Sequence, residues 1–174
     1  MEKKVILHIP HSSTKIPLTE GYLVDSITLE NEILKLTDWY TDELFYSDED
    51  EMIVADFSRI FCDPERFTDD SQEVMAQYGM GVLYEKSDNG EEIRIVTPEL
   101  KEKVLSSYYW KHHNKFDSAV NQQLNCLGKD TIIDCHSYPS QPLKRDLDKN
   151  PKRPDFNIGT DSFHFTNVEA VLRR

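Results

Sequence analysis

Residues 4–13 of the chain read KVILHIPHSS, and this stretch decides the expected fold. Its first half, Lys4 to His8, is a short apolar run that ends just before a proline, which is the pattern of a buried strand. Such a strand places two histidines in the loop that follows it. Thr131 to Cys135 is a second apolar and β-branched run, and it reads as a central parallel strand that ends at His136.

Helical and strand patterns alternate between these two segments. Apolar residues recur at three- and four-residue steps from Thr28 to Tyr46, which predicts an amphipathic helix with Thr28 as its N-cap. Met52 to Asp56 predicts another strand. A proline opens a long helical stretch over Pro98 to Leu127, and Gly128 ends it.

The remaining segments are shorter. Val82–Tyr84 and Ile93–Val96 flank Asn89-Gly90, which indicates a hairpin. Asn157 to Gly159 reads as a short strand, and Val168 to Arg174 as the start of a helix. Strands separated by long helices predict one α/β domain over residues 1–174, with a mixed, largely parallel sheet flanked by helices.

Composition limits the class of protein. The chain has 174 residues, of which 38% are hydrophobic and 30% charged, as in a globular domain. Its net charge of -12 repels phosphate backbones, so we expect no nucleic-acid partner. No apolar run approaches the roughly 20 residues of a membrane span, so we expect a cytoplasmic protein. The three cysteines lack C-x-x-C spacing, and we expect them to be reduced and buried.

Three histidines follow predicted strands. His8, His11 and His136 all lie at strand ends, where ligands collect in α/β sheets. Three neutral imidazoles and an open position suit a catalytic zinc, which lowers the pKa of a bound water to roughly 7. A single loop histidine is more often a hydrogen-bonding residue, so the metal reading rests on the three together. Asp134 could orient a ligand, and Asp38 could complete the site as a carboxylate ligand.

Other polar residues suggest contacts to a substrate. Arg59 follows a predicted strand, where it could bind a carboxylate or polarise a carbonyl, although a surface ion pair explains it equally well. Arg66 and Ser137 are further substrate-binding candidates. His112 and His113 adjoin on a helix and point about 100° apart, so at most one faces the site. We expect that one to be His113, as a proton shuttle or substrate contact.

Taken in order, several short segments give the chain its resemblance to the N-formylglutamate amidohydrolase family. A weaker member of the set is Asn157-Ile158-Gly159-Thr160. The others are His8-Ile9-Pro10-His11-Ser12, Thr37-Asp38-Trp39, Asp56-Phe57-Ser58-Arg59 with Asp63-Pro64, Tyr108 to His113, and Asp134-Cys135-His136-Ser137. The family resembles zinc carboxypeptidases in fold.

The resemblance implies a zinc-dependent hydrolase that cleaves an N-formyl or other N-acyl amino acid with metal-activated water. Arg59 would hold or polarise this small-molecule substrate. Two ligand sets stay open, because some members lack a histidine at the position of His8. The first is His8, His11 and His136, and the second is His11, Asp38 and His136.

The chain departs from the family pattern at three places. Ser58 stands where the family has asparagine, and His112-His113 stands where the family has Tyr-His. Nothing after Val168 resembles the carboxylate-bearing strand that would supply the general base. We therefore expect that the chain is truncated or works differently, with Asp134 or His113 acting as a base through a water molecule. The alternative hypothesis is a catalytically impaired binding module on the same scaffold, which recognises acylated amino acids or acidic peptides.

Overall fold

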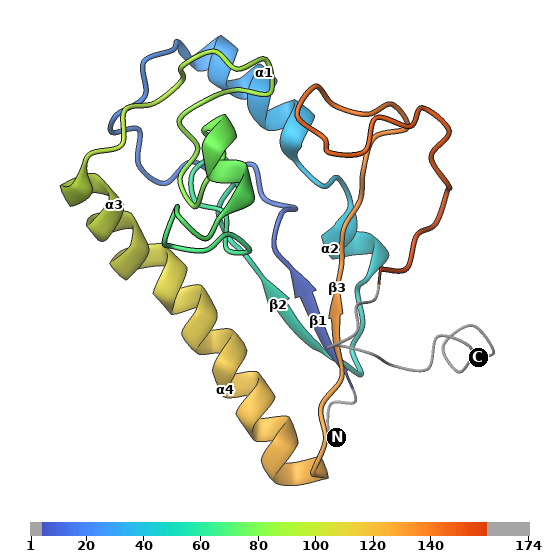
Figure 1. Ribbon diagram of the computed structural model, residues 1–174. Helices are drawn as coiled ribbons and strands as arrows, with labels where there is room; N and C mark the ends of the chain where they lie inside the picture. The colour runs from blue at the N-terminus through green and yellow to red at the C-terminus, as the bar shows by residue number, and fades with distance from the viewer. Residues whose placement is uncertain (1–4, 160–174) are drawn as a thin grey trace.

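The computed structural model describes residues 5–159 and contains one parallel sheet (Figure 1). Its strands are β1 (Ile6–Ile9), β2 (Glu51–Val54) and β3 (Ile132–Asp134), in the order β2-β1-β3. Parallel neighbours need crossover connections, and here helices and long loops supply them. The expected α/β class with a sheet flanked by helices is confirmed, while the likeness to zinc carboxypeptidases stays a prediction.

The place of β3 in the sheet differs from the expected one. β1 lies in the centre and is buried along its whole length. The strand expected at the centre, β3, is instead the edge strand among the described residues, and its Ile132 and Ile133 are 45% and 43% exposed. An apolar β-branched run shows that a strand is suited to burial, but not which neighbours it has.

Different segments cover the two faces of the sheet. On one face, Ile6 and Ile53 pack against Phe116 and Ala119 of α4 (Trp110–Leu127). On the other face, Leu7, Ile9 and Cys135 form a cluster against which Phe45 packs. Because successive residues of a strand point to opposite faces, His8 lies on the α4 side of the sheet. Figure 1 shows α4 running past the sheet to the lower end of the molecule.

The helix expected over Thr28 to Tyr46 is two helices with a break between them. α1 spans Ser26–Leu36 and α2 spans Thr41–Leu44. The N-cap of α1 is Asp25, whose carboxylate accepts a hydrogen bond from the backbone of Thr28, so the expected cap at Thr28 is wrong.

Tertiary contacts cause this break. The backbone N–H of Asp38 donates to the carbonyl of His11 at 3.0 Å, which draws residue 38 out of the helical path. Thr37 is extended, and Tyr40 adopts a left-handed conformation with φ 64. An apolar pattern continues through the break, so the sequence alone does not reveal it.

The long helical stretch from Pro98 to Leu127 is confirmed, with an irregular turn in it. α3 (Pro98–Val104) begins after the N-cap Thr97, the π-helical turn η2 (Leu105–Tyr109) follows, and α4 completes the stretch. Gly128 ends it in a left-handed conformation with φ 69. Single π turns occur often at functional sites.

The expected hairpin is present only as a turn. Lys86 and Glu92 form an isolated antiparallel bridge, and the N–H of Ile93 donates to the carbonyl of Glu85. Val82–Tyr84 and Ile93–Val96 are not strands, because their backbones form only the isolated bridges Met80–Tyr84 and Tyr22–Arg94. The unexpected 3₁₀ helix η1 (Val74–Tyr78) lies near this turn.

Four smaller expectations remain. Asn157 to Gly159 forms no strand, and the helix expected from Val168 lies outside the described residues. All three cysteines are free, but Cys126 is exposed, whereas Cys62 and Cys135 are buried as expected. No helix in residues 5–159 has the length and apolar character needed to cross a bilayer.

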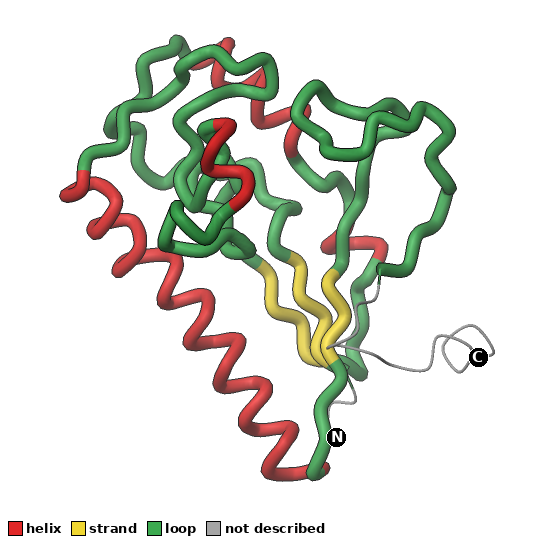
Figure 2. Tube along the Cα trace, in the orientation of Figure 1, coloured by secondary structure: helices red, strands yellow, loops and turns green. Residues whose placement is uncertain are grey.

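Loops gather beyond the carboxyl ends of the three strands, as Figure 2 shows. The segments that follow β1, β2 and β3 all enter this region, and they carry His11, Arg59 and His136. Ligand sites of open α/β sheets lie at this edge. The fold therefore brings together residues that lie far apart in the sequence.

Candidate metal centre and adjoining pocket

His11 and His136 lie side by side at the carboxyl end of the sheet. The centroids of their rings are 5.3 Å apart, and His11 is only 1% exposed. Asp38 lies next to both rings, because its Oδ2 is 2.9 Å from Nδ1 of His136 and 3.7 Å from Nδ1 of His11. The structure thus brings together His11, His136 and Asp38, three of the four residues expected to bind metal.

Glu65 joins the same group from the loop after β2. Its Oε2 lies 3.3 Å from Nε2 of His11, and its Oε1 lies 3.2 Å from Nε2 of His136. The ligand atoms of His11, Glu65 and His136 all lie within 4.8 Å of one another. Sequence reasoning missed Glu65, although it adjoins Asp63-Pro64, and only its place in a strand-end loop could have marked it.

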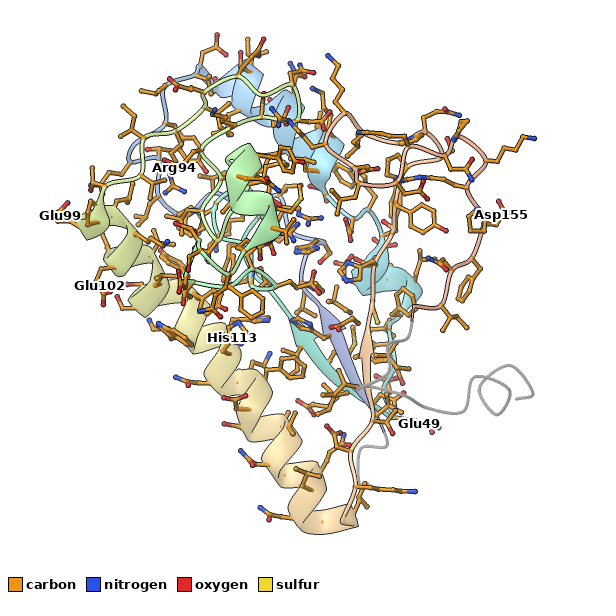
Figure 3. All side chains as sticks on the ribbon, in the orientation of Figure 1. Glu49, Arg94, Glu99, Glu102, His113 and Asp155 are labelled. Carbon is orange, nitrogen blue, oxygen red and sulfur yellow. The ribbon has the colours of Figure 1, made fainter. Side chains whose placement is uncertain are left out.

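Two local contacts position Glu65. Its backbone N–H donates to Oδ1 of Asp63 at 3.1 Å, which closes a tight turn. Nε2 of His113 donates to the carbonyl of Pro64 at 2.9 Å. His113, labelled in Figure 3 on the side of α4 that faces the molecule, therefore contacts the backbone of the loop rather than the metal-ligand candidates.

The electrostatic field between these side chains favours a bound cation. Burial alone would lower the pKa of His136, but hydrogen bonds to Asp38 and Glu65 raise it to about 10. Burial would raise the pKa of Asp38, but the nearby His11, the hydrogen bond from His136 and the charge of Arg59 lower it to about 2. Carboxylates that favour a proton on an imidazole also favour a divalent ion in its place.

The donor set fits zinc. Two imidazoles and one carboxylate are the ligands of several catalytic zinc sites. Nδ1 of His11 is buried and has no hydrogen-bond partner, so one nitrogen of this residue is unused by the protein. Asp38 contacts the Nδ1 of His136, which is the usual way in which an outer carboxylate fixes the ring of a metal-bound histidine.

His8 does not join this group and turns toward α4 instead. Its Nδ1 is 2.6 Å from Oδ1 of Asp134, and its Nε2 is 2.9 Å from Nε2 of His112. Its ring also stacks on Phe116 at 4.6 Å. The hydrogen bond from His8 lowers the pKa of Asp134. His112, the neighbour that was expected to face away, is thus the histidine of α4 that contacts another candidate residue.

Arg59 is held rigidly by buried partners. Its Nη2 donates to Oδ2 of Asp63 at 3.3 Å, its Nε to the hydroxyl of Tyr84 at 3.2 Å, and its Nη1 to Oδ1 of Asp38 at 3.5 Å. Burial lowers the pKa of Arg59, but Tyr84 and the two carboxylates more than offset this and raise it above its usual range. The guanidinium is therefore a fixed positive charge.

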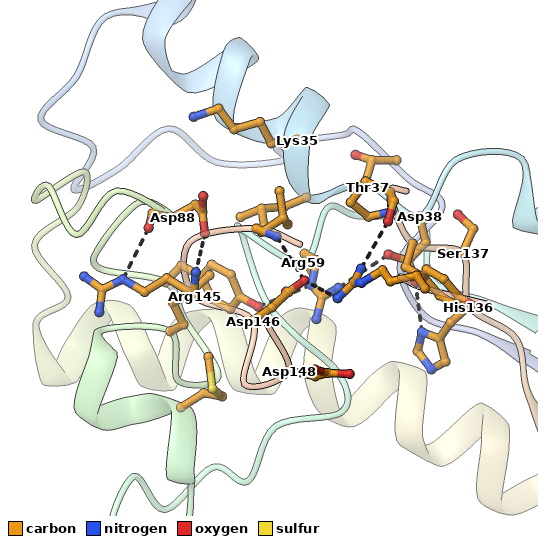
Figure 4. Close-up of a pocket in the computed structure, with 18 of the residues that line it drawn as sticks. Lys35, Thr37, Asp38, Arg59, Asp88, His136, Ser137, Arg145, Asp146 and Asp148 are labelled. Carbon is orange, nitrogen blue, oxygen red and sulfur yellow. Dashed lines mark hydrogen bonds and ion pairs between the residues drawn. The ribbon is translucent and has the colours of Figure 1, made fainter. Parts of the chain in front are cut away.

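A cavity of about 380 Å³ adjoins this group (Figure 4). Asp38, Arg59 and His136 lie at one end, and Asp88 and Arg145 at the other. The basic residues that line the cavity are Lys35, Arg59, Arg66, Arg145 and Arg153. Four aspartates also line it, Asp38, Asp88, Asp146 and Asp148, so the lining carries charges of both signs and suits a polar ligand.

The remaining two substrate-binding candidates also line the cavity. Arg66 forms ion pairs with Asp63 at 3.4 Å and Glu73 at 3.5 Å. The hydroxyl of Ser137 donates to the carbonyl of Trp39 at 3.0 Å. These contacts place both side chains at the cavity wall, while their roles toward a substrate stay predictions.

Comparisons with known proteins show which family this chain is similar to. A sequence profile described as FGase, N-formylglutamate amidohydrolase, matches residues 3–173. No curated protein matches the chain significantly. A crystal structure of N-formylglutamate amidohydrolase from Ralstonia eutropha JMP134 is similar, with a TM-score of 0.68 and 21% sequence identity. The similarity covers 80% of this chain and 56% of that chain, so this chain spans a little over half the length of that protein.

Proposed function

Because the chain belongs to the N-formylglutamate amidohydrolase family, we propose that it is a metal-dependent hydrolase of an N-formyl or other N-acyl amino acid. The observation that carries the proposal is the convergence of His11, His136 and Glu65, because His136 also lines a cavity beside Arg59. The family indicates the type of reaction, and the site supplies candidate metal ligands and a guanidinium for it.

His11, His136 and Glu65 would hold the metal ion, and zinc suits their donor atoms. When bound, zinc polarises an amide carbonyl and activates water at neutral pH. Asp38 was expected to bind the metal directly. We propose instead that it orients His136, because it accepts a hydrogen bond from Nδ1 of that residue. It thereby holds the ring with Nε2 turned toward Glu65.

Arg59 would bind the substrate. It lines the cavity next to His136, and its charge is fixed by Asp63, Asp38 and Tyr84. A guanidinium in this place can donate hydrogen bonds to the α-carboxylate of an amino acid or to the oxygen of its acyl group. Arg66 and Ser137 would line the same substrate at the cavity wall.

The two candidates for proton transfer receive other roles in this proposal. Nε2 of His113 is occupied by the carbonyl of Pro64, so His113 would position the loop that carries Glu65. The pKa of Asp134 is lowered by its hydrogen bond from His8, which makes it a weak proton acceptor at neutral pH. We therefore do not assign Asp134 the role of general base.

Release of formate from N-formyl-L-glutamate by the purified chain tests the proposal. We expect activity with added zinc and none after a chelator. The Glu65→Gln and His136→Ala variants should lose more than about 100-fold, because even partners of metal ligands cost 10–100-fold when removed. Glu30→Gln, the same change on the exposed surface of α1, should leave activity unchanged.

The alternative, a binding module without catalysis, predicts a different result. Calorimetry would then detect binding of N-formylglutamate to the cavity, while no formate would appear at any metal concentration. Neither binding nor formate release by the zinc-loaded chain would sink both hypotheses for this substrate.

A further inference from the structure

A second group of metal-ligating side chains lies beside the first. The ligand atoms of His8, Asp134 and Glu65 fall within 4.8 Å of one another, and Glu65 belongs to both groups. We propose that the site holds two divalent cations, the second bound by His8 and Asp134 and bridged to the first by Glu65. This proposal rests on the proposed function, since it adds an ion to the same site.

The sheet holds His8 and Asp134 in register. They are direct partners on the neighbouring parallel strands β1 and β3, and Nδ1 of His8 lies 2.6 Å from Oδ1 of Asp134. The N–H of Cys135 donates to the carbonyl of His8 at 2.8 Å, which fixes the ends of both strands. Ligands on strands keep their geometry better than ligands on loops.

Glu65 is placed to bridge two ions. Its two oxygens approach His11 and His136 at 3.3 Å and 3.2 Å, and the same carboxylate reaches the pair formed by His8 and Asp134. Two-metal hydrolytic sites place their ions about 3.5–4 Å apart, a separation that one carboxylate can span. The side chain of Glu65 is 28% exposed, so solvent ions can reach it.

Glu65 and Asp134 face histidines rather than permanently charged side chains. Within residues 5–159, neither carboxylate has a lysine or arginine at ion-pair distance, and their ion-pair partners are histidines. Arg59 and Arg66 pair with other carboxylates instead. Two carboxylates close together repel each other, and a divalent cation between them removes that repulsion.

His112 completes the surroundings of His8. Its Nε2 lies 2.9 Å from Nε2 of His8, and both rings are buried, at 6% and 3% exposure. If Nδ1 of His8 binds a metal, its Nε2 carries the hydrogen and donates a hydrogen bond to Nε2 of a neutral His112. Metal-bound histidines usually donate their other N–H in this way, which fixes the tautomer and the ring.

The donors define the class of ion. A site with one imidazole nitrogen and two carboxylates suits zinc, manganese or cobalt, because magnesium and calcium prefer oxygen ligands alone. The second ion is therefore expected to be a first-row transition dication, as in the first group. The two sites differ in exposure, since the Asp134 side chain is 54% exposed and His11 is almost fully buried.

Metal content per chain tests the proposal. The chelator-treated protein is titrated with zinc, freed of loosely held ions, and analysed by mass spectrometry of the elements. We expect two zinc ions per chain for the wild type and one for His8→Asn and for Asp134→Asn. Glu65→Gln should lose at least one ion, and Glu30→Gln should retain two.

Electron paramagnetic resonance of the manganese-loaded protein gives a second readout. Two bridged ions should produce an exchange-coupled spectrum in the wild type. As a control, His8→Asn should show isolated ions only. One zinc per wild-type chain, or two in His8→Asn, overturns the second site while leaving the first. No bound zinc at all overturns the metal-dependent function itself, so the two failures are distinguishable.

Discussion

Asp63 shows how a single buried carboxylate organises the candidate site. It is 0% exposed and accepts hydrogen bonds from Tyr84 at 2.9 Å and from Arg59 at 3.3 Å. It also contacts Nε2 of His11 at 2.9 Å. Burial would raise the pKa of Asp63, but His11 and Arg59 hold it well below the usual value. The charged form is therefore the one around which the other residues are arranged.

Replacing Asp63 with asparagine should destabilise the fold strongly. The change leaves the buried charge of Arg59 without its main partner, and breaking a buried pair in this way costs about 3–5 kcal/mol. Unfolding in urea measures the loss. Asp56→Asn, on an exposed residue of the same loop, should change the free energy of unfolding by less than about 0.5 kcal/mol. Equal effects of the two changes would contradict this account of Asp63.

The break between α1 and α2 matters for the site at the scale of elements. It releases Asp38 from the helix and places it beside His11 and His136. A continuous helix would carry residue 38 with its own regular hydrogen bonds and would deny His11 its backbone partner. A local departure from helical structure thus builds part of the candidate metal centre.

The end of α4 depends on Gly128. Its φ of 69 lies in the left-handed region, and no atom lies within 4 Å of an added Cβ, so only backbone strain opposes a side chain there. Gly128→Ala should cost about 1–2 kcal/mol, the usual cost of this conformation for other residues. Thermal and urea unfolding measure it. Gly159→Ala, where φ is ordinary and space is also open, should cost clearly less.

The whole molecule combines an acidic net charge with a cavity in which arginines lie among aspartates. The net charge of -12 disfavours large polyanions as partners. Buried titratable groups also make the stability of the whole chain depend on pH. Burial, followed by the charge of His8, lowers the pKa of His112 to about 3, and burial also lowers the pKa of His113.

These two histidines should make the metal-free protein less stable in acid. Their folded pKa values lie below the unfolded value of about 6.5, so the unfolded chain binds more protons between the two values. The contribution of these two histidines to stability is complete above about pH 6.5 and falls as the pH drops toward the folded values. His113→Gln, which can still donate to Pro64, should make the fall shallower. Urea unfolding with a chelator present, at about pH 7.5 and pH 5, measures how much the free energy of unfolding falls. An equal fall in the variant and the wild type would falsify this origin.

Much of the fold follows from the sequence by itself. The apolar runs determine β1 and β2, the three- and four-residue pattern determines α1, and Pro98 and Gly128 mark the ends of the long helical stretch. These signals are local, because a buried strand or a helix end requires particular residues at that place. The histidines at strand ends likewise indicate where a site forms.

Only the tertiary structure decides which residues complete the site. Asp38 joins it because the carbonyl of His11 interrupts a helix, and Glu65 joins because the turn at Asp63 folds back over both histidines. His8, although only three residues before His11, points to the other partner group, since β1 alternates its faces and α4 covers the face of His8. Sequence determined the chemistry available at each strand end, and packing between distant segments decided which of these groups meet.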